Sequence, residues 1–169
     1  MRLIKADCAD FDRIYPAMCE SFIPEEIRDE KEARAVLGEK NYTAYKIYEN
    51  DVWVGFITLW ELSDFAFVEP FVIFSEFRGR GLGAKCLKEV KGMYEKLVLE
   101  AEPPIDEIQK RRIGFYNRCG FFANDYPYIQ PSYREGGVGV TLLLMSYPRP
   151  LCNCDSVKNE LYKEVYKVK

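Results

Sequence analysis

The sequence predicts a single domain of the α/β (α+β) class, in which helices cover both faces of a mixed β-sheet. Its length of 169 residues suits one domain, and no repeat, low-complexity tract or linker divides it. Strand-like alternation and helical periodicity follow one another in the order β-α-α-β-β-β-α-β-α-β-β. A glycine-rich turn joins a strand-like segment to a helical one near the middle of the chain.

The first half of the chain is expected to hold a short strand, two helices, and a hairpin that leads into a further strand. Pro24 suits the first position of a helix and Gly38 its C-terminal stop, so the second helix is expected between them. The hairpin alternates in polarity and is expected to turn at residues 49–51. The expected elements are strand 1–6, helix 10–22, helix 24–38, hairpin 42–62 and strand 65–74.

The second half begins with a helix whose apolar positions follow a period of 3.6 residues. Pro70 removes a hydrogen-bond donor from strand 65–74, which predicts a bulge or a gap in the pairing there. The remaining expected elements are helix 82–97, strand 97–102, helix 103–120, strands 121–126 and 139–147, and a short amphipathic helix within 156–168.

Composition limits the classes of function. The hydrophobic fraction of 48% is too high for a disordered chain, and the net charge of −3 argues against non-specific nucleic-acid binding. No apolar run approaches the roughly 20 residues that cross a bilayer. The first residues lack the apolar core of a signal peptide. We therefore expect a cytoplasmic protein without a nucleic-acid or membrane partner.

The chain has no histidine and six cysteines. Cys152 and Cys154 form the only close cysteine pair, and a C-x-C pair without a second pair or a histidine is a poor zinc motif. We expect no metal, and we expect reduced structural thiols, with Cys86 and Cys119 on apolar helix faces. Without histidine, acid–base chemistry is left to Glu, Asp, Tyr, Lys or Cys.

The glycine-rich turn "FRGRGLGAK", residues 77–85, has the composition of a phosphate-binding loop. A helix N-terminus presents free N–H groups and a partial positive charge, and glycines let a bulky anion approach the backbone. Two familiar phosphate loops do not fit. Walker A requires Ser or Thr after Lys85, and the dinucleotide motif requires glycine where Cys86 stands.

What does fit is R-x-x-G-x-G, formed by Arg78, Gly81 and Gly83, which resembles the acyl-CoA-binding motif of the GNAT superfamily of N-acetyltransferases. A second stretch, "FYNRCGF" at 115–121, resembles the later Y-x-x-x-G-F signature of that superfamily, with Tyr116 as its tyrosine. The resemblance covers about residues 1–148. It implies a GNAT-like domain at 1–150, followed by a C-terminal tail at 151–169.

The resemblance implies a mostly antiparallel sheet of about six to seven strands, whose fourth and fifth strands splay apart around acetyl-CoA. It also implies acetyl-CoA as co-substrate, an amine acceptor, and a monomer or homodimer. The asparagine that often contacts the pantetheine arm is missing, with Gln109 the nearest substitute. The residues that the resemblance assigns to acetyl-CoA are Val72, Ile73, Ser75, Arg78, Gly79, Arg80, Gly81, Leu82, Gly83 and Ala84.

For catalysis, the resemblance implies direct attack of the amine on the thioester, without an acyl-enzyme. It gives a backbone amide near Val72 or Ile73 the role of donor to the carbonyl oxygen, and gives Tyr116 the role of proton source for the thiolate. The general base is expected to be Glu69 or Glu100. Glu100 and Glu102 share one strand face, so one could line the cleft while the other is solvated.

The acceptor site is expected on the two early helices and the loops before the last strands. Phe22, Glu25, Glu26, Asp29 and the tyrosine-rich stretch 124–137 would suit a cationic amine. Peptide N-termini, polyamines, aminoglycosides and aromatic amines all remain open. Two other readings also stay open at this point: a GNAT-like domain that binds acyl-CoA as a regulatory ligand without catalysis, and an unrelated nucleotide-binding domain.

Overall fold

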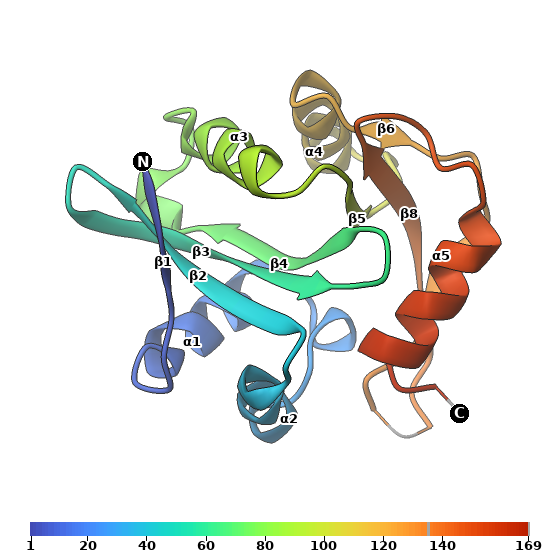
Figure 1. Cartoon of the computed structure of the whole chain (residues 1–169), viewed down its shortest axis with the longest axis horizontal. Helices are drawn as coiled ribbons and strands as arrows, with labels where there is room; N and C mark the ends of the chain where they lie inside the picture. Colours follow the sequence, from blue (N-terminus) through green and yellow to red (C-terminus); the bar gives the residue numbers. More distant parts are fainter. Residues whose placement is uncertain (135, 169) are drawn as a thin grey trace.

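The computed structural model describes residues 1–134 and 136–168 and has an eight-stranded sheet with helices on both faces (Figure 1). The sheet order is β1-β2-β3-β4-β5-β8-β6, and β7 pairs with β8 outside this path. All pairs are antiparallel except β4 with β5. The fold class is confirmed, and the short strand β7 lies in a stretch that was expected to be a loop.

The strands are β1 (Arg2–Lys5), β2 (Tyr42–Glu49), β3 (Val52–Glu61), β4 (Ala66–Ile73), β5 (Leu97–Ala101), β6 (Phe122–Ala123), β7 (Tyr128–Gln130) and β8 (Val140–Tyr147). The α-helices are α1 (Phe11–Ser21), α2 (Glu30–Ala35), α3 (Leu82–Met93), α4 (Glu107–Arg118) and α5 (Cys154–Glu160). Four shorter helical turns are η1 (Pro24–Glu26), η2 (Val36–Gly38), η3 (Ser75–Phe77) and the π-helical η4 (Leu161–Val165).

The single helix predicted at 24–38 is wrong, because the segment is divided into η1, α2 and η2. The backbone is extended at Ile27, and Asp29 begins α2 by accepting a hydrogen bond from the N–H of Glu32. This break buries both Ile27 and Arg28. Tertiary burial of these two side chains therefore overrides the helical pattern of the segment.

The predicted hairpin is confirmed in β2 and β3. Asn50 and Asp51 form its turn with positive φ angles of 47° and 64°, which Asn and Asp tolerate better than most residues. The predicted disturbance near Pro70 is also confirmed. The register between β3 and β4 shifts between Ile57 and Leu59, where Thr58 donates a hydrogen bond to the carbonyl oxygen of Glu69.

The fourth and fifth strands separate as expected. β4 pairs with β5 only where residues 66–68 meet residues 97–99, although β4 continues to Ile73 and β5 to Ala101. Beyond these three pairs the two strand edges face each other without a ladder. The gap therefore opens at the position of Glu69 on one strand and Glu100 on the other.

Helices α3 and α4 cover one face of the sheet, and α1 and α2 cover the other (Figure 1). The C-terminal segment packs on the α2 face, where Leu161 and Val165 of η4 join a buried cluster with Trp60. All six cysteines are free, and Cys86 and Cys119 are buried. No helix within residues 1–134 or 136–168 is long and apolar enough to cross a membrane.

Leu161→Ala is expected to destabilise the whole domain by about 2–5 kcal/mol, because Leu161 is 0% exposed and truncation leaves a cavity. Lys163→Ala, on the exposed side of the same turn, is the matched control. Urea unfolding followed by tryptophan fluorescence measures both. A single transition shifted in Leu161→Ala alone would show that the tail folds with the sheet. An unchanged midpoint would show that the tail is dispensable for stability.

Candidate active site

A cleft of about 630 Å³ occupies the gap between β4 and β5 and continues to both faces of the sheet. On the α3 and α4 face it is bounded by the glycine-rich turn and by Tyr116. On the α1 and α2 face it is bounded by η1, Glu69 and Glu100. The predicted site residues that line the cleft are Glu69, Val72, Ile73, Arg78, Gly79, Gly81, Leu82, Gly83, Glu100 and Tyr116.

The glycine-rich turn brings an uncapped helix N-terminus to the cleft. Gly79 and Gly81 have φ angles of 76° and 73°, and no atom lies within 4 Å of the position where a Cβ would stand at either residue. Gly81 is the N-cap residue of α3, whose first turn has no side-chain cap. The first amides of α3 therefore face open space, as a phosphate site requires.

Gly83 has a different physical reason to be glycine. A Cβ at this position would lie 3.0 Å from Cζ of Phe115, so the missing side chain lets α3 pack closely against α4. Gly83 lines the cleft, but its substitution would disturb this packing as well as any ligand. Gly81 is thus the cleaner position for testing anion binding.

The polar side chains of this segment mostly hold the turn itself. Arg78 donates to the carbonyl oxygen of Ile73 at 2.9 Å and to Oγ of Ser21 at 3.1 Å, so it ties the turn to β4 and α1. Arg80 donates to the carbonyl oxygen of Glu76 at 3.0 Å. Arg80, Ser75 and Ala84 were also predicted to bind acetyl-CoA, but they are exposed and lie outside the lining of the cleft.

The backbone of β4 offers free hydrogen-bonding groups to the gap. The N–H of Phe74 donates to Val54 on β3, and N–H groups alternate in direction along a strand. The amide of Val72 therefore also points toward β3, whereas those of Phe71 and Ile73 point toward the gap. Of the two amides predicted as donors, Ile73 has the suitable direction.

Tyr116 on α4 lines the cleft on the α3 side of the gap. Its ring packs against Phe115 and Phe121, with centroids 5.2 and 5.8 Å away. Burial raises the pKa of Tyr116 to about 12, partly offset by the charge of Arg112. The hydroxyl is therefore protonated at neutral pH and is available as a proton donor.

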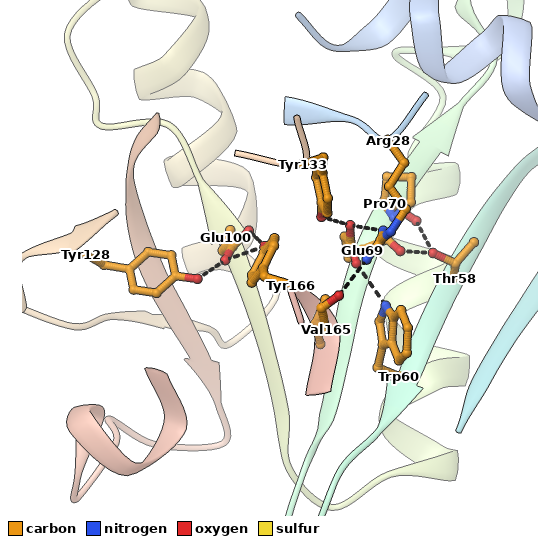
Figure 2. A network of polar contacts seen from close by, with 10 residues as sticks. All are labelled: Arg28, Thr58, Trp60, Glu69, Pro70, Glu100, Tyr128, Tyr133, Val165 and Tyr166. Carbon is orange, nitrogen blue, oxygen red and sulfur yellow. Dashed lines mark hydrogen bonds and ion pairs between the residues drawn. The ribbon is translucent and has the colours of Figure 1, made fainter. Parts of the chain in front are cut away.

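Glu69 forms the centre of a polar cluster on the opposite face (Figure 2). Its Oε1 accepts hydrogen bonds from Arg28 Nη1 at 2.6 Å and from the hydroxyl of Tyr133, and its Oε2 accepts one from Trp60 Nε1 at 2.8 Å. Arg28 and Glu69 are both largely buried, and the Arg28 guanidinium lies 4.3 Å from the Tyr133 ring centroid. A buried positive charge and two neutral donors thus fix this carboxylate.

Glu100 has a different environment, because among residues 1–134 and 136–168 its hydrogen-bond donors are the neutral hydroxyls of two tyrosines. Tyr166 donates to Oε2 at 2.6 Å, and Tyr128 donates to Oε1. Burial raises the pKa of Glu100 to about 8; the two tyrosine hydrogen bonds act in the opposite direction, and the charges of Glu69 and Glu26 raise the pKa further. Such a carboxyl exchanges protons near neutral pH, which is the property of a general base.

The C-terminal segment contacts both carboxylate clusters. Tyr166 holds Glu100, and the carbonyl oxygen of Val165 accepts a hydrogen bond from Arg28 Nη2 at 3.0 Å. None of the three residues Tyr166, Val165 and Arg28 was predicted to belong to the site. The tyrosines of 156–168 were the available signal, but they do not indicate a partner on a distant strand, and the continuous helical pattern at 24–38 gives no sign that Arg28 is buried.

The expected acceptor wall is only partly present. Phe22 and Glu26 line the cleft, whereas Glu25 is exposed and Asp29 caps α2. Burial and the charge of Glu102 raise the pKa of Glu26. Glu100 of β5 and Glu102, which follows the strand, both line the cleft.

Two polar residues of α4 have structural partners. Arg112 forms an ion pair with Glu102 at the edge of the cleft. Gln109 belongs to a capping box with Asp106 at the first turn of the helix and lies outside the cleft lining. It therefore does not substitute for the missing asparagine.

Comparisons with known proteins agree with this geometry. The model of the acetyltransferase (GNAT) family matches residues 9–121, which is two thirds of the chain. A curated relative, YjbC of Bacillus subtilis (strain 168), is named as a candidate acetyltransferase. It is 31% identical over 111 residues, which cover 63% of this chain and 55% of that protein. The chain thus spans about half the length of this relative.

Solved structures give the same result. A GNAT-family protein from Bacteroides thetaiotaomicron, also named as a candidate acetyltransferase, is 31% identical, with full coverage of both chains (100% each) and a TM-score of 0.92. An aminoglycoside 6′-N-acetyltransferase in complex with coenzyme A is 16% identical, covers 89% of this chain and 100% of that one, and has a TM-score of 0.61. The second likeness shows the fold alone.

A sheet whose strands β4 and β5 separate around a cleft open to both faces is the architecture of an acetyltransferase. The chain belongs to the acetyltransferase (GNAT) family. The resemblance found in the sequence is therefore confirmed, and the reading as an unrelated nucleotide-binding domain is wrong.

Proposed function

We propose that the protein transfers an acetyl group from acetyl-CoA to a primary amine of a small molecule or peptide, by direct attack of the amine in a ternary complex. One observation carries the proposal: a protonated tyrosine and a carboxyl with a pKa near 8 lie on opposite sides of a gap in the sheet. Leaving-group protonation and amine deprotonation need groups placed in this way.

Acetyl-CoA supplies an activated acyl group as a thioester. The uncapped amides at the start of α3 and the glycines at 79 and 81 would hold its pyrophosphate. The unpaired edge of β4 would bind its pantetheine arm, and the amide of Ile73 would donate to the thioester oxygen as negative charge develops there. The fit rests on the open space and free donors of this chain.

We assign the remaining roles as follows. Glu100 takes the proton from the acceptor amine, because its pKa allows it to ionise near neutral pH. Glu69 remains paired with Arg28, and its charge contributes to the raised pKa of Glu100. Tyr116 gives its proton to the departing thiolate on the other face.

A second candidate is a family member that binds acyl-CoA as a regulatory ligand without catalysis. The favouring observation is that oxygens of both Glu69 and Glu100 already accept hydrogen bonds from protein side chains. In this case acetyl-CoA would bind, but no amine would release free thiol. A panel of primary amines, with acetyl-CoA binding measured by thermal shift and turnover measured by thiol release, separates the two functions.

Tyr116→Phe is expected to lower kcat by ~10²–10⁴-fold, because the thiolate loses its proton donor. Acetyl-CoA affinity should change little, since the ring and its aromatic contacts are retained. Tyr94→Phe is the matched control, because Tyr94 donates to Glu61 and lies outside the cleft lining. Turnover by Tyr116→Phe equal to that of wild type would assign this tyrosine to packing alone.

A further inference from the structure

Gln130, the last residue of β7, has an unusual environment for a glutamine. The residue belongs to the lining of the cleft, although it is only 3% exposed. Within residues 1–134 and 136–168, its Nε2 is buried and no hydrogen-bond acceptor lies within reach. Buried polar groups in native structures are almost always hydrogen-bonded, so an unpaired amide at a cavity wall indicates a ligand group that accepts from it.

The strand register places this amide on the acceptor side of the gap. Gln130 pairs with Val140 and Tyr128 with Leu142, so Gln130 and Tyr128 project to the same face of β7. Tyr128 donates to Glu100, which identifies this face as that of the candidate base. Gln130 lies two residues further along the strand, about 7 Å away.

The chemistry of a neutral carboxamide restricts the partner. Nε2 only donates, so its partner must offer an oxygen acceptor. Protonated amines have no acceptor, so a polyamine would leave Nε2 unpaired when bound. A carboxamide is complementary to another amide, because one group can donate to the carbonyl oxygen while accepting from the N–H.

We infer that Gln130 is a specificity-determining residue that recognises an amide carbonyl near the reactive amine, so that the acceptors are aminoacyl amides such as peptide N-termini. The inference rests on the proposed function and assigns a substrate class to the same site. A site that hydrogen-bonds a substrate group discriminates strongly against analogues that lack it, because its own polar atoms then remain unpaired.

The test compares two acceptors in two proteins. Alaninamide carries the amide carbonyl and isopropylamine lacks it, and kcat/KM for each is measured by thiol release with wild type and with Gln130→Met. The wild type is expected to prefer alaninamide, and Gln130→Met is expected to reduce this preference by roughly 5- to 100-fold. The two amines differ in basicity, but this difference affects wild type and Gln130→Met equally. It therefore cancels when the preference of one protein is divided by that of the other.

A matched control and a stability measurement separate recognition from structure. Ile129→Met changes the adjacent residue, which is 53% exposed and projects to the other face, and should keep the wild-type preference. Gln130→Met removes an unpaired buried amide, so its melting temperature should equal or exceed that of wild type. A melting temperature well below wild type would assign Gln130 a structural role and overturn the inference.

The other outcomes are also decisive. If Gln130→Met keeps the wild-type preference while both proteins turn over, Gln130 does not recognise the acceptor, although the proposed function stands. If acetyl-CoA binds but neither amine nor any peptide releases thiol, the proposed function fails and the inference fails with it. Binding of N-acetylalaninamide to the CoA-saturated protein, lost in Gln130→Met and retained in Ile129→Met, would support it independently of turnover.

Discussion

Glu100→Gln is expected to lower kcat/KM by ~10²–10⁴-fold and to remove the rise of activity between about pH 6 and 8. Glutamine preserves the size of the side chain and can still accept hydrogen bonds from Tyr128 and Tyr166. It cannot accept a proton from the amine. The loss would therefore reflect chemistry rather than collapse of the cluster.

The sign of the pH effect follows from the raised pKa. A base must be ionised to act, and a carboxyl with a pKa of about 8 is mostly protonated at pH 6. Activity of the wild type should therefore increase with pH, reach half of its maximum near pH 8, and level off about one unit above that. The acceptor amine can titrate in the same range, so the profile must be measured with two acceptors of different basicity. If the pH of this rise in the wild type changes with the pKa of the acceptor amine, and Glu100→Gln keeps full activity, the reaction needs no protein base.

The same pKa makes a separate prediction for stability. The folded carboxyl keeps its proton up to pH about 8, whereas the ordinary value for an unfolded chain is 4.5. The folded state thus binds more protons between these values, and stability falls as pH rises through this window. The loss is on the order of 5 kcal/mol at 1.36 kcal/mol per pKa unit. Urea unfolding at pH 5 and pH 8.5 should show most of this loss in wild type and not in Glu100→Gln.

Two further variants locate the effect. Glu69→Gln should retain the rise of activity with pH, because Glu69 is held by Arg28 and does not act as the base in our assignment. Glu61→Gln alters a carboxylate that bonds Tyr94 outside the cleft and should behave as wild type. If the rise of activity with pH is lost in Glu69→Gln and kept in Glu100→Gln, then Glu69 is the general base and Glu100 is not.

Gly81→Glu is expected to weaken acetyl-CoA binding by about 10²–10³-fold. The new carboxylate would stand at the uncapped N-terminus of α3, where we place the pyrophosphate. Two unit charges 4 Å apart near a protein surface repel by about 4 kcal/mol. The side chain would also occupy the open space beside the glycine. Isothermal titration calorimetry with acetyl-CoA measures the effect.

Gly136→Glu is the matched control, because it adds the same charge at a glycine of nearly equal φ, 71° against 73°, with no neighbouring atom within 4 Å of the Cβ position. Both variants should lose a similar amount of stability, about 1–2 kcal/mol for a side chain in the left-handed region. Only Gly81→Glu should lose acetyl-CoA. Equal affinities in the two variants would place the pyrophosphate elsewhere.

The parts of the site that could be predicted from the sequence are local ones. The glycines at 79–83 and Tyr116 belong to short motifs whose residues are close in the chain. Glu69 and Glu100 were singled out because the family resemblance places a glutamate on the fourth strand or on the fifth as the candidate base. The residues that hold these carboxylates could not be found in this way. Arg28 is 41 residues from Glu69, and Tyr166 is 66 residues from Glu100.

The error in the fold has the same origin. The pattern at 24–38 is helical, and the helix is interrupted because Arg28 turns inward to reach Glu69 and Val165. A buried guanidinium needs its partners, and the free energy of these contacts outweighs local helix propensity. Sequence periodicity records the local preference and contains no information on the distant partner.

The short pairing between β4 and β5 is expected to act as a hinge. Strands β1 to β4 form one plate and β5, β8 and β6 another, joined within the sheet by three residue pairs at 66–68 and 97–99. On the α2 face, Tyr133 from the segment between β7 and β8 ties the second plate to Glu69 on the first. Rocking of the plates would therefore widen the α3 face most, where we place the thioester, while the carboxylates stay in register. A substitution in these three residue pairs would therefore change the width of the whole cleft, although the substituted residue lies at the closed end of the gap.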